Sequence, residues 1–302
     1  MWPWWSALLA LGASLVVLWV LRAGVHVMML RGLRAPRVAH PVSLADLDLR
    51  GLEVRLAGVN GKTLFAWFVP GPGLAPAPAI LVMHGWGANA AMMSACLPPL
   101  QQAGMAVLLV DARCHGQSDD EDFTSLPRFA EDIATGLNWL RAQSQVNPDQ
   151  LAIVGHSVGA AAALLCASRR QDVGAVVSIS AFAHPADVMR RFLASHHIPY
   201  PVLGWYILRH VQKVIGARFD DIAPLRSITQ VGCQVLLVHG MDDEMVPFED
   251  AKRIQAAGAA GRVELLAVAG RHDPSAALVH HLPVLAVFLR RALEDRAPAL
   301  SR

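Results

Sequence analysis

A long apolar stretch without a charged side chain opens the sequence. It runs from Trp2 to Leu21, which is the length that a helix needs to cross the hydrocarbon core of a membrane. Tryptophans stand near both of its ends, as they do in the two interfacial layers of a bilayer, at positions Trp2, Trp4, Trp5 and Trp19. The pattern predicts an uncleaved membrane anchor within residues 1–30.

A cleaved signal peptide and a buried core helix are the alternatives for this stretch. A signal peptide usually has a basic region before its apolar core and a small-x-small cleavage site after it, and neither pattern is present here. A core helix is difficult to place before the first strand. Basic side chains follow the stretch, so the positive-inside rule predicts that the downstream domain lies on the cytoplasmic face, as at a bacterial inner membrane; these are Arg22, Arg31, Arg34 and Arg37.

Residues 31–50 contain prolines and are mixed in polarity, which predicts a connector. Two alternating runs follow, Leu52–Leu56 and Thr63–Val69, with Asn60-Gly61 between them. Asn-Gly between β-rich runs is a strong signal for a hairpin.

Beyond the hairpin, short apolar runs alternate with helical segments. Continuous apolar strands separated by helices indicate a mostly parallel sheet that helices cover on both faces, and we expect this α/β domain to span residues 51–295. The expected strands are Ala79–Met83, Ala106–Val110, Leu151–Val154, Ala175–Ile179, Val235–Val238 and Val263–Val268. The expected helices lie near residues 90–103, 127–143, 158–169, 248–257 and 275–293.

One interval interrupts this alternation. Residues 181–231 contain no strand pattern but do contain amphipathic stretches with His, Pro, Trp and Tyr residues. Such an insertion predicts a helical cap over the domain. The run from Trp205 to Leu208 within it suggests an apolar pocket.

Composition excludes several functions. The net charge is +2 and no dense basic run is present, so nucleic acid is not expected as a partner. The four cysteines are widely spaced and predict no disulfide framework, which favours a reducing compartment. The 13 histidines form no H-E-x-x-H and no Cys/His cluster, so neither a metal nor another cofactor is expected.

The strongest local signal is Gly155-His156-Ser157-Val158-Gly159, which follows a predicted strand and precedes a predicted helix. In that context G-x-S-x-G places a serine in a strained turn at the edge of the sheet, so Ser157 is the candidate nucleophile. A serine needs a base that a third group orients. Two later strand ends supply candidates, a carboxylate-rich loop that contains Asp243 and a loop that contains His272.

These motifs resemble the α/β-hydrolase superfamily, in particular its serine-aminopeptidase-like and esterase-like branches with a helical cap. The resemblance covers roughly residues 52–293. It places the acid of an H-G-x-x-D-x-x-V-P pattern at Asp243, one residue after Asp242, and the base of a G-x-H stretch at His272. It also implies that the backbone N–H groups of Trp86, in His84-Gly85-Trp86-Gly87, and of Val158 form an oxyanion hole.

The segment from Asp111 to Ser118 resembles the D-x-R-G-x-G-x-S loop of that superfamily, except that Cys114 replaces the usual glycine. We expect this loop to be structural, and the sequence does not assign a role to Cys114. The resemblance implies a serine hydrolase that cleaves a carboxylic ester or related acyl bond in a small-molecule or lipid-like substrate. An acyltransferase and a membrane-tethered, non-catalytic binding protein are the alternatives.

Overall fold

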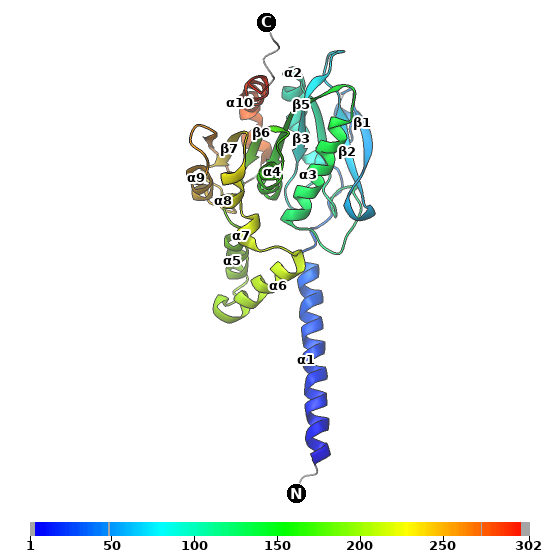
Figure 1. The fold of residues 1–302 in the computed structure, drawn as a ribbon, viewed down its shortest axis with the longest axis vertical. Helices are drawn as coiled ribbons and strands as arrows, with labels where there is room; N and C mark the ends of the chain where they lie inside the picture. Colours follow the sequence, from blue (N-terminus) through cyan, green and yellow to red (C-terminus); the bar gives the residue numbers. More distant parts are fainter. Residues whose placement is uncertain (1–3, 48, 273, 297–302) are drawn as a thin grey trace.

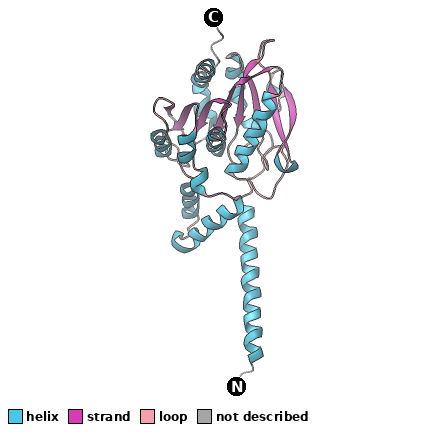
Figure 2. Cartoon of the chain, in the orientation of Figure 1, coloured by secondary structure: helices cyan, strands magenta, loops and turns pink. Residues whose placement is uncertain are grey.

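A computed structural model describes residues 4–47, 49–272 and 274–296, and side chains for all of these except residues 21, 202 and 274–280. Trp2 of the predicted anchor lies outside the described residues. An eight-stranded sheet forms the centre of the domain, with helices on both sides (Figures 1 and 2). The strands are β1 (Leu52–Ala57), β2 (Thr63–Val69), β3 (Ala77–Met83), β4 (Ala106–Val110), β5 (Val146–His156), β6 (Val173–Ile179), β7 (Gln234–Gly240) and β8 (Val263–Val268).

The helices begin with the N-terminal α1 (Trp4–Gly32), most of which projects away from the domain (Figure 1). The helices packed along the sheet are η3 (Ala90–Cys96), α2 (Leu97–Gln102), α3 (Leu126–Arg141), α4 (Val158–Ser168), α9 (Phe248–Ala257) and α10 (Pro274–Glu294). Single turns occur at η1 (Ala45–Leu47) and η2 (Val59–Gly61).

The strands follow the order β1-β2-β4-β3-β5-β6-β7-β8. Strand β2 is antiparallel to both β1 and β4, and the remaining neighbours are parallel. The hairpin between β1 and β2 turns through Asn60 and Gly61, whose φ angles of 59° and 67° suit these two residue types. The predicted mostly parallel α/β sheet and its hairpin are therefore confirmed.

Both faces of the central strands are buried, which explains why their sequences are continuously apolar. In β5, Ile153 packs with α3 and α4, whereas its neighbour Val154 packs with α2 and α10 on the opposite face. Each fully buried aliphatic side chain of this kind stabilises the fold by roughly 1.5–3 kcal/mol.

The helix predicted near residues 90–103 is two elements. Its first part, η3, is a 3₁₀ helix whose N-cap Asn89 accepts a hydrogen bond from the Met92 amide. Pro98 and Pro99 lie in the first turn of α2. Proline has no N–H to donate within a helix, so a continuous α-helix cannot run through these positions.

The described residues of the cap between β6 and β7 form helices that short turns and loops connect. The cap contains α5 (Pro185–Ser195), the π-helical turn η4 (Tyr200–Gly204), α6 (Trp205–Ile215), α7 (Phe219–Ile222), α8 (Pro224–Ser227) and η5 (Ile228–Gln230). Leu193, Leu208 and Val211 of the cap join the core that also contains α3 and α4. The cap is thus anchored to the domain by its own apolar face.

Helix α1 is long and apolar enough to cross a membrane. Its most apolar 18 residues have a mean hydropathy of 2.1, and 0% of them are buried within the protein. An N-terminal signal sequence meets the same criteria. The C-terminal end of α1 approaches α6 of the cap, and the chain then continues into the domain (Figure 1).

The predicted connector packs on the domain. Arg37 donates hydrogen bonds to the carbonyls of His115 and Ser118, and Asn89 donates to those of Val38 and Ala39. Pro36 packs against Gly87: a Cβ on this glycine would be 3.1 Å from Cγ of Pro36. Contacts therefore fix the segment that follows α1 against the loops after β3 and β4.

Candidate active site

Ser157 lies between β5 and α4 in an unusual backbone conformation. Its φ and ψ are 54° and −117°, a region that a residue with a side chain enters only when its surroundings impose it. Its N–H donates to the carbonyl of Ile179 on β6 at 2.8 Å, and its own carbonyl accepts from the Ala161 amide at 3.0 Å. Strand and helix together therefore impose the strained turn.

The two glycines of the motif are needed because other backbone atoms pack against them. A Cβ on Gly159 would lie 2.7 Å from the carbonyl oxygen of Met83 and against that of His84. A Cβ on Gly155 would lie 2.7 Å from the Ala160 amide nitrogen. This packing brings α4 close to the end of β3 and so brings the serine close to the loop that follows β3.

Ser157, His272 and Asp243 form a hydrogen-bonded line across the carboxyl ends of the strands. Nδ1 of His272 is 2.8 Å from Oδ2 of Asp243, and Nε2 is 3.1 Å from Oγ of Ser157. The carboxylate only accepts, so Nδ1 carries the proton and Nε2 is left to accept from the serine hydroxyl. The structure thus brings the three predicted residues together in the order required for proton transfer.

Asp243 is buried and ionised at this position. Burial opposes its ionisation, but hydrogen bonds from His272 and from the Val246 amide outweigh burial, so the pKa of Asp243 lies below its ordinary value. The amides of Met245 and Val246 donate to Oδ1 at 3.0 and 2.8 Å and leave Oδ2 for the histidine. The neighbouring Asp242 is exposed, as expected from its place in the motif.

Gly85 lies directly against the nucleophile. A Cβ on this glycine would be 3.2 Å from Cβ of Ser157, which places the loop after β3 beside the serine side chain. Among the described residues, the N–H groups of Trp86 and Val158 donate to no acceptor. Val158 is also the first residue of α4, where the helix dipole favours negative charge. Both predicted amides are therefore available to a substrate oxygen.

Comparison of the sequence with known proteins finds a family and several relatives that this chain resembles. The family described as "Serine aminopeptidase, S33" matches residues 75–215, a range that contains Ser157 and the loop after β3. The uncharacterized protein Rv2307c of Mycobacterium tuberculosis is 29% identical over 238 residues, which cover 78% of each chain. The uncharacterized protein YfhR of Escherichia coli is 26% identical over 228 residues, 73% of this chain and 72% of that protein.

Solved structures share the fold. An esterase of Pyrococcus furiosus, Pf2001, superimposes with a TM-score of 0.70 at 19% identity, over 86% of this chain and 97% of its own. The chain has the α/β-hydrolase fold. The esterase domain of a Rhodothermus marinus protein is a further structural relative, with a TM-score of 0.58 at 22% identity over 80% of this chain and 99% of its own.

One histidine that supports this site was not singled out from the sequence. Nε2 of His156, the residue before the nucleophile, donates to the backbone carbonyl of His272 at 3.0 Å, and the two rings are 5.1 Å apart. His156 therefore holds the loop that carries the base. Its place at the end of β5 was visible in the sequence, but its partner is 116 residues away.

Two buried histidines hold the backbone of the loop after β3. Nε2 of His84 accepts from the Ala112 amide, so its Nδ1 carries a proton and donates to the carbonyl of Gly85 at 2.7 Å. Nε2 of His115 accepts from the Gly87 amide at 3.1 Å, and its Nδ1 donates to the carbonyl of Arg113. Burial lowers the pKa of His84 and lowers that of His115 to about 3, so both rings stay neutral.

The loop after β4 is structural, as predicted. Asp111 accepts from the amides of Ala90 and Gln117 and from Nε2 of His40. Although burial raises the pKa of Asp111, these donors outweigh burial and leave it below its ordinary value. The loop is thereby tied to η3 and to the connector.

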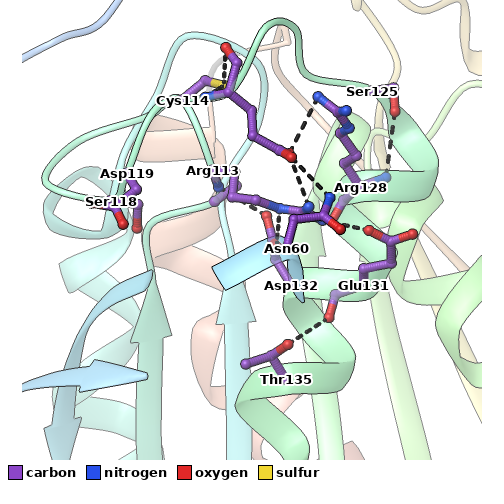
Figure 3. A network of polar contacts seen from close by, with 12 residues as sticks. Asn60, Arg113, Cys114, Ser118, Asp119, Ser125, Arg128, Glu131, Asp132 and Thr135 are labelled. Atoms are coloured by element: carbon purple, nitrogen blue, oxygen red, sulfur yellow. Dashed lines mark hydrogen bonds and ion pairs between the residues drawn. The ribbon is translucent and has the colours of Figure 1, made fainter. Parts of the chain in front are cut away.

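Arg113 is fully buried and pairs with three carboxylates (Figure 3). Its guanidinium lies 2.7 Å from Asp132, 2.6 Å from Glu131 and 3.0 Å from Glu121. Burial raises the pKa of Asp132, and the positive charge of Arg113 opposes that rise. This cluster joins the loop after β4 to α3, and its residues precede the nucleophile Ser157 in the sequence.

Cys114 occupies a left-handed backbone position with a φ of 66°, which explains why glycine is usual in this loop. Its thiol is buried, accepts from the Glu121 amide at 3.3 Å, and lies 3.7 Å from the carbonyl of Phe123. Burial raises the pKa of the Cys114 thiol. These contacts give the cysteine a local structural role, because a protonated buried thiol is a poor nucleophile.

The run from Trp205 to Leu208 does not form a closed apolar pocket. Leu208 is buried, but Trp205 and Tyr206 are 54% and 37% exposed because α6 is amphipathic and turns these two aromatic side chains outward. A hollow of about 1010 Å³ lies between α5, α6 and α7, and charged side chains such as Asp187, Arg190 and Arg253 line much of it. Trp205 and Leu208 of the run do line this hollow, but its lining is largely charged, so the prediction that the pocket is apolar is wrong.

Proposed function

We propose that this α/β-hydrolase is a serine hydrolase that cleaves a carboxylic ester or related acyl bond. The observation that carries the proposal is the hydrogen-bonded line from Ser157 through His272 to Asp243, with the serine in a strained turn. The imidazole activates the serine hydroxyl, and the buried carboxylate orients the imidazole. Neither the stability nor the packing of the fold requires this combination.

The proposed reaction has two steps. The Ser157 oxygen attacks the acyl carbonyl while Nε2 of His272 takes its proton, and the imidazolium that forms is stabilised by Asp243. The Trp86 and Val158 amides donate to the oxyanion. His272 then protonates the leaving alcohol, which departs and leaves an acyl-serine.

Water completes the cycle in the second step. His272 accepts a proton from the attacking water, and the tetrahedral intermediate again places its oxyanion at the Trp86 and Val158 amides. Collapse expels Ser157, which regains its proton from His272, and releases the carboxylic acid. No group other than these side chains and amides is needed for the proton transfers.

Membrane attachment through α1 is the second part of the proposal. Support comes from the length and hydropathy of the helix and from the outward exposure of its apolar side chains. The arginines that follow its apolar part favour the cytoplasmic face for the hydrolase domain. A lipid-like acyl substrate fits this location.

The direct test is turnover of p-nitrophenyl esters of increasing chain length by the purified full chain. Ser157→Ala is expected to lower kcat by ~10⁴-fold or more, because the activated nucleophile is lost. Ser168→Ala, at the opposite end of α4, is the matched control and should retain wild-type turnover. Equal turnover by Ser157→Ala and the wild type would refute the assignment of the nucleophile.

A further inference from the structure

Helices α1 and α6 enclose a hollow at their junction that the proposed reaction does not use. Its volume is about 350 Å³, at the lower end of the range for small-ligand sites. We call it the α1–α6 hollow; it is lined by Trp19, Arg22, Ala23 and His26 of α1 and by His210, Lys213 and Val214 of α6. Figure 1 shows α6 crossing close to the end of α1 that leads into the domain.

A histidine pair joins the two helices. Nδ1 of His26 lies 3.0 Å from Nε2 of His210, and the rings meet edge to face at 5.2 Å. Tyr206 stacks on His210 at 5.9 Å. Tyr206, His210 and Lys213 are four and three residues apart and so share one face of α6, opposite the buried Leu208 and Val211. The polar and aromatic face of α6 is thus turned toward α1.

The hollow holds cations without a matching anion. None of the described carboxylates forms an ion pair with Arg22 or Lys213, whereas Arg253 elsewhere in the cap pairs with Asp187 and Asp250. Burial lowers the pKa of His210, and the charges of His26, Arg22 and Lys213 lower it further. The surroundings of His210 are therefore positive and favour an anionic ligand.

The rise of α1 sets the depth of the hollow relative to a membrane. A hydrocarbon core of about 30 Å takes about 20 helical residues at ~1.5 Å each, so a span that begins at Trp4 ends near Arg22. His26 then lies roughly 6 Å beyond Arg22, at the level of the headgroups. Trp19 lies at the inner edge of the interface, where tryptophan is favoured.

We infer that the α1–α6 hollow binds the phosphate of an anionic phospholipid headgroup, with Arg22 and Lys213 contacting the phosphate. Trp19 and Val214 supply an apolar wall for the glycerol and the first carbons of the acyl chains. A free phosphate ion has neither glycerol nor acyl chains and would not use this wall. Basic pockets beside membrane helices suit anionic headgroups for the same reasons. The bound lipid holds α6, and with it the cap, at the bilayer surface. The inference rests on the proposed membrane span of α1.

The test measures lipid retention by the full chain in detergent. Native mass spectrometry follows the protein mixed with equal amounts of phosphatidylglycerol and phosphatidylcholine, with inorganic phosphate as a separate competitor. We expect one phosphatidylglycerol to be retained in preference to phosphatidylcholine. The double variant Arg22→Gln/Lys213→Gln should weaken phosphatidylglycerol binding by about thirtyfold, from two cation contacts near a lipid surface.

The matched control is Arg31→Gln/Arg209→Gln, which removes the same charge from exposed positions of the same two helices. Unchanged binding by this control supports the hollow. An equal loss in the control, no loss in the hollow variant, or displacement by inorganic phosphate at concentrations comparable to the lipid would each overturn the inference.

Failure of the proposed function would be recognised separately. Ser157→Ala should retain phosphatidylglycerol as the wild type does, because the serine lies outside the hollow. The hollow variant should keep ester turnover in detergent, because Arg22 and Lys213 take no part in the proposed chemistry. The mass of the intact chain in the same spectra reports directly whether α1 has been removed as a signal peptide.

Discussion

Asp242 and Asp243 are adjacent carboxylates with different surroundings, and this difference decides which of them orients the base. Asp243 is buried, receives two backbone amides on one oxygen and contacts His272 with the other. Asp242 is exposed to solvent. A backbone turn that places one side chain inward turns its neighbour outward.

Asp243→Asn should lower kcat for ester hydrolysis by ~10⁴-fold while leaving the domain folded. The amide of asparagine would donate to Nδ1 of His272, so that Nε2 would carry the proton and could no longer accept one from Ser157. Asp242→Asn is the matched control and is expected to stay near wild-type turnover. Similar losses in both variants would mean that loop structure, and not the imidazole tautomer, was affected.

The buried His115 gives the fold a dependence on pH. Folding lowers its pKa from 6.5 to about 3, mainly through burial, so below pH 6.5 the unfolded chain binds the extra proton. The stability linked to this ring is therefore complete above pH 6.5 and falls toward pH 3, by ~1.4 kcal/mol for each pH unit. Folding also lowers the pKa of His84, with the same sign.

His115→Gln should reduce the slope of unfolding free energy against pH by ~1.4 kcal/mol per pH unit, which corresponds to one proton. The glutamine amide oxygen can still accept a hydrogen bond from Gly87, but the side chain does not titrate. Urea unfolding of both proteins at a series of acidic pH values measures the slope. Identical slopes for variant and wild type would show that His115 is not held neutral by the fold.

At the scale of elements, the Arg113 cluster joins the loop after β4 to α3. Its guanidinium and the carboxyl group of Asp132 are essentially shielded from solvent, with 0% and 1% of their side chains exposed. Removing one partner from such a pair leaves the other buried without a counter-charge, which costs far more than loss of a surface pair.

Arg113→Ala is therefore expected to lower the free energy of unfolding by about 3–5 kcal/mol. Arg218→Ala removes an arginine whose pair with Asp220 is largely exposed, with 74% and 69% of the two side chains accessible, and should change stability by less than ~1 kcal/mol. Urea denaturation measures both. A loss of stability in Arg113→Ala no larger than in the control would contradict the structural role of the cluster.

Sequence patterns predict the elements well where the signal is local. The apolar runs correspond to β3–β8 because both faces of the sheet are buried, and Asn60-Gly61 predicts its hairpin because both residues tolerate positive φ. The break between η3 and α2 is also local, since it depends on Pro98 and Pro99. The prediction of one helix over that range did not use the prolines.

The grouping of Ser157, Asp243 and His272 was predictable because each follows a strand of one parallel sheet, whose carboxyl ends meet at one edge. Contacts between segments that are distant in the sequence were not predictable. His156 reaches the backbone of His272, and Pro36 packs on Gly87, without any periodicity that marks them. The outward turn of Trp205 and Tyr206 likewise depends on which face of α6 meets the core.

At the scale of the whole molecule, α1, the connector and the candidate site are linked. The connector contacts the loops after β3 and β4, which lie at the carboxyl edge of the sheet together with Ser157. That edge therefore faces the end of the domain from which α1 departs (Figure 1). With α1 in a bilayer, the proposed active site would lie on the membrane-facing side of the domain and close to acyl substrates.

The most direct test of the central claim is labelling of Ser157 in membranes that contain the full chain. Carbonate-washed membranes are treated with a fluorescent fluorophosphonate probe and with a small phosphonate that a cap cannot exclude, beside Ser157→Ala, and the labelled peptide is identified by mass spectrometry. We predict a single adduct on Ser157 in the membrane pellet of the wild type and none in the variant. Folded wild-type protein that reacts with neither probe, or labelling that persists in Ser157→Ala, would contradict the account.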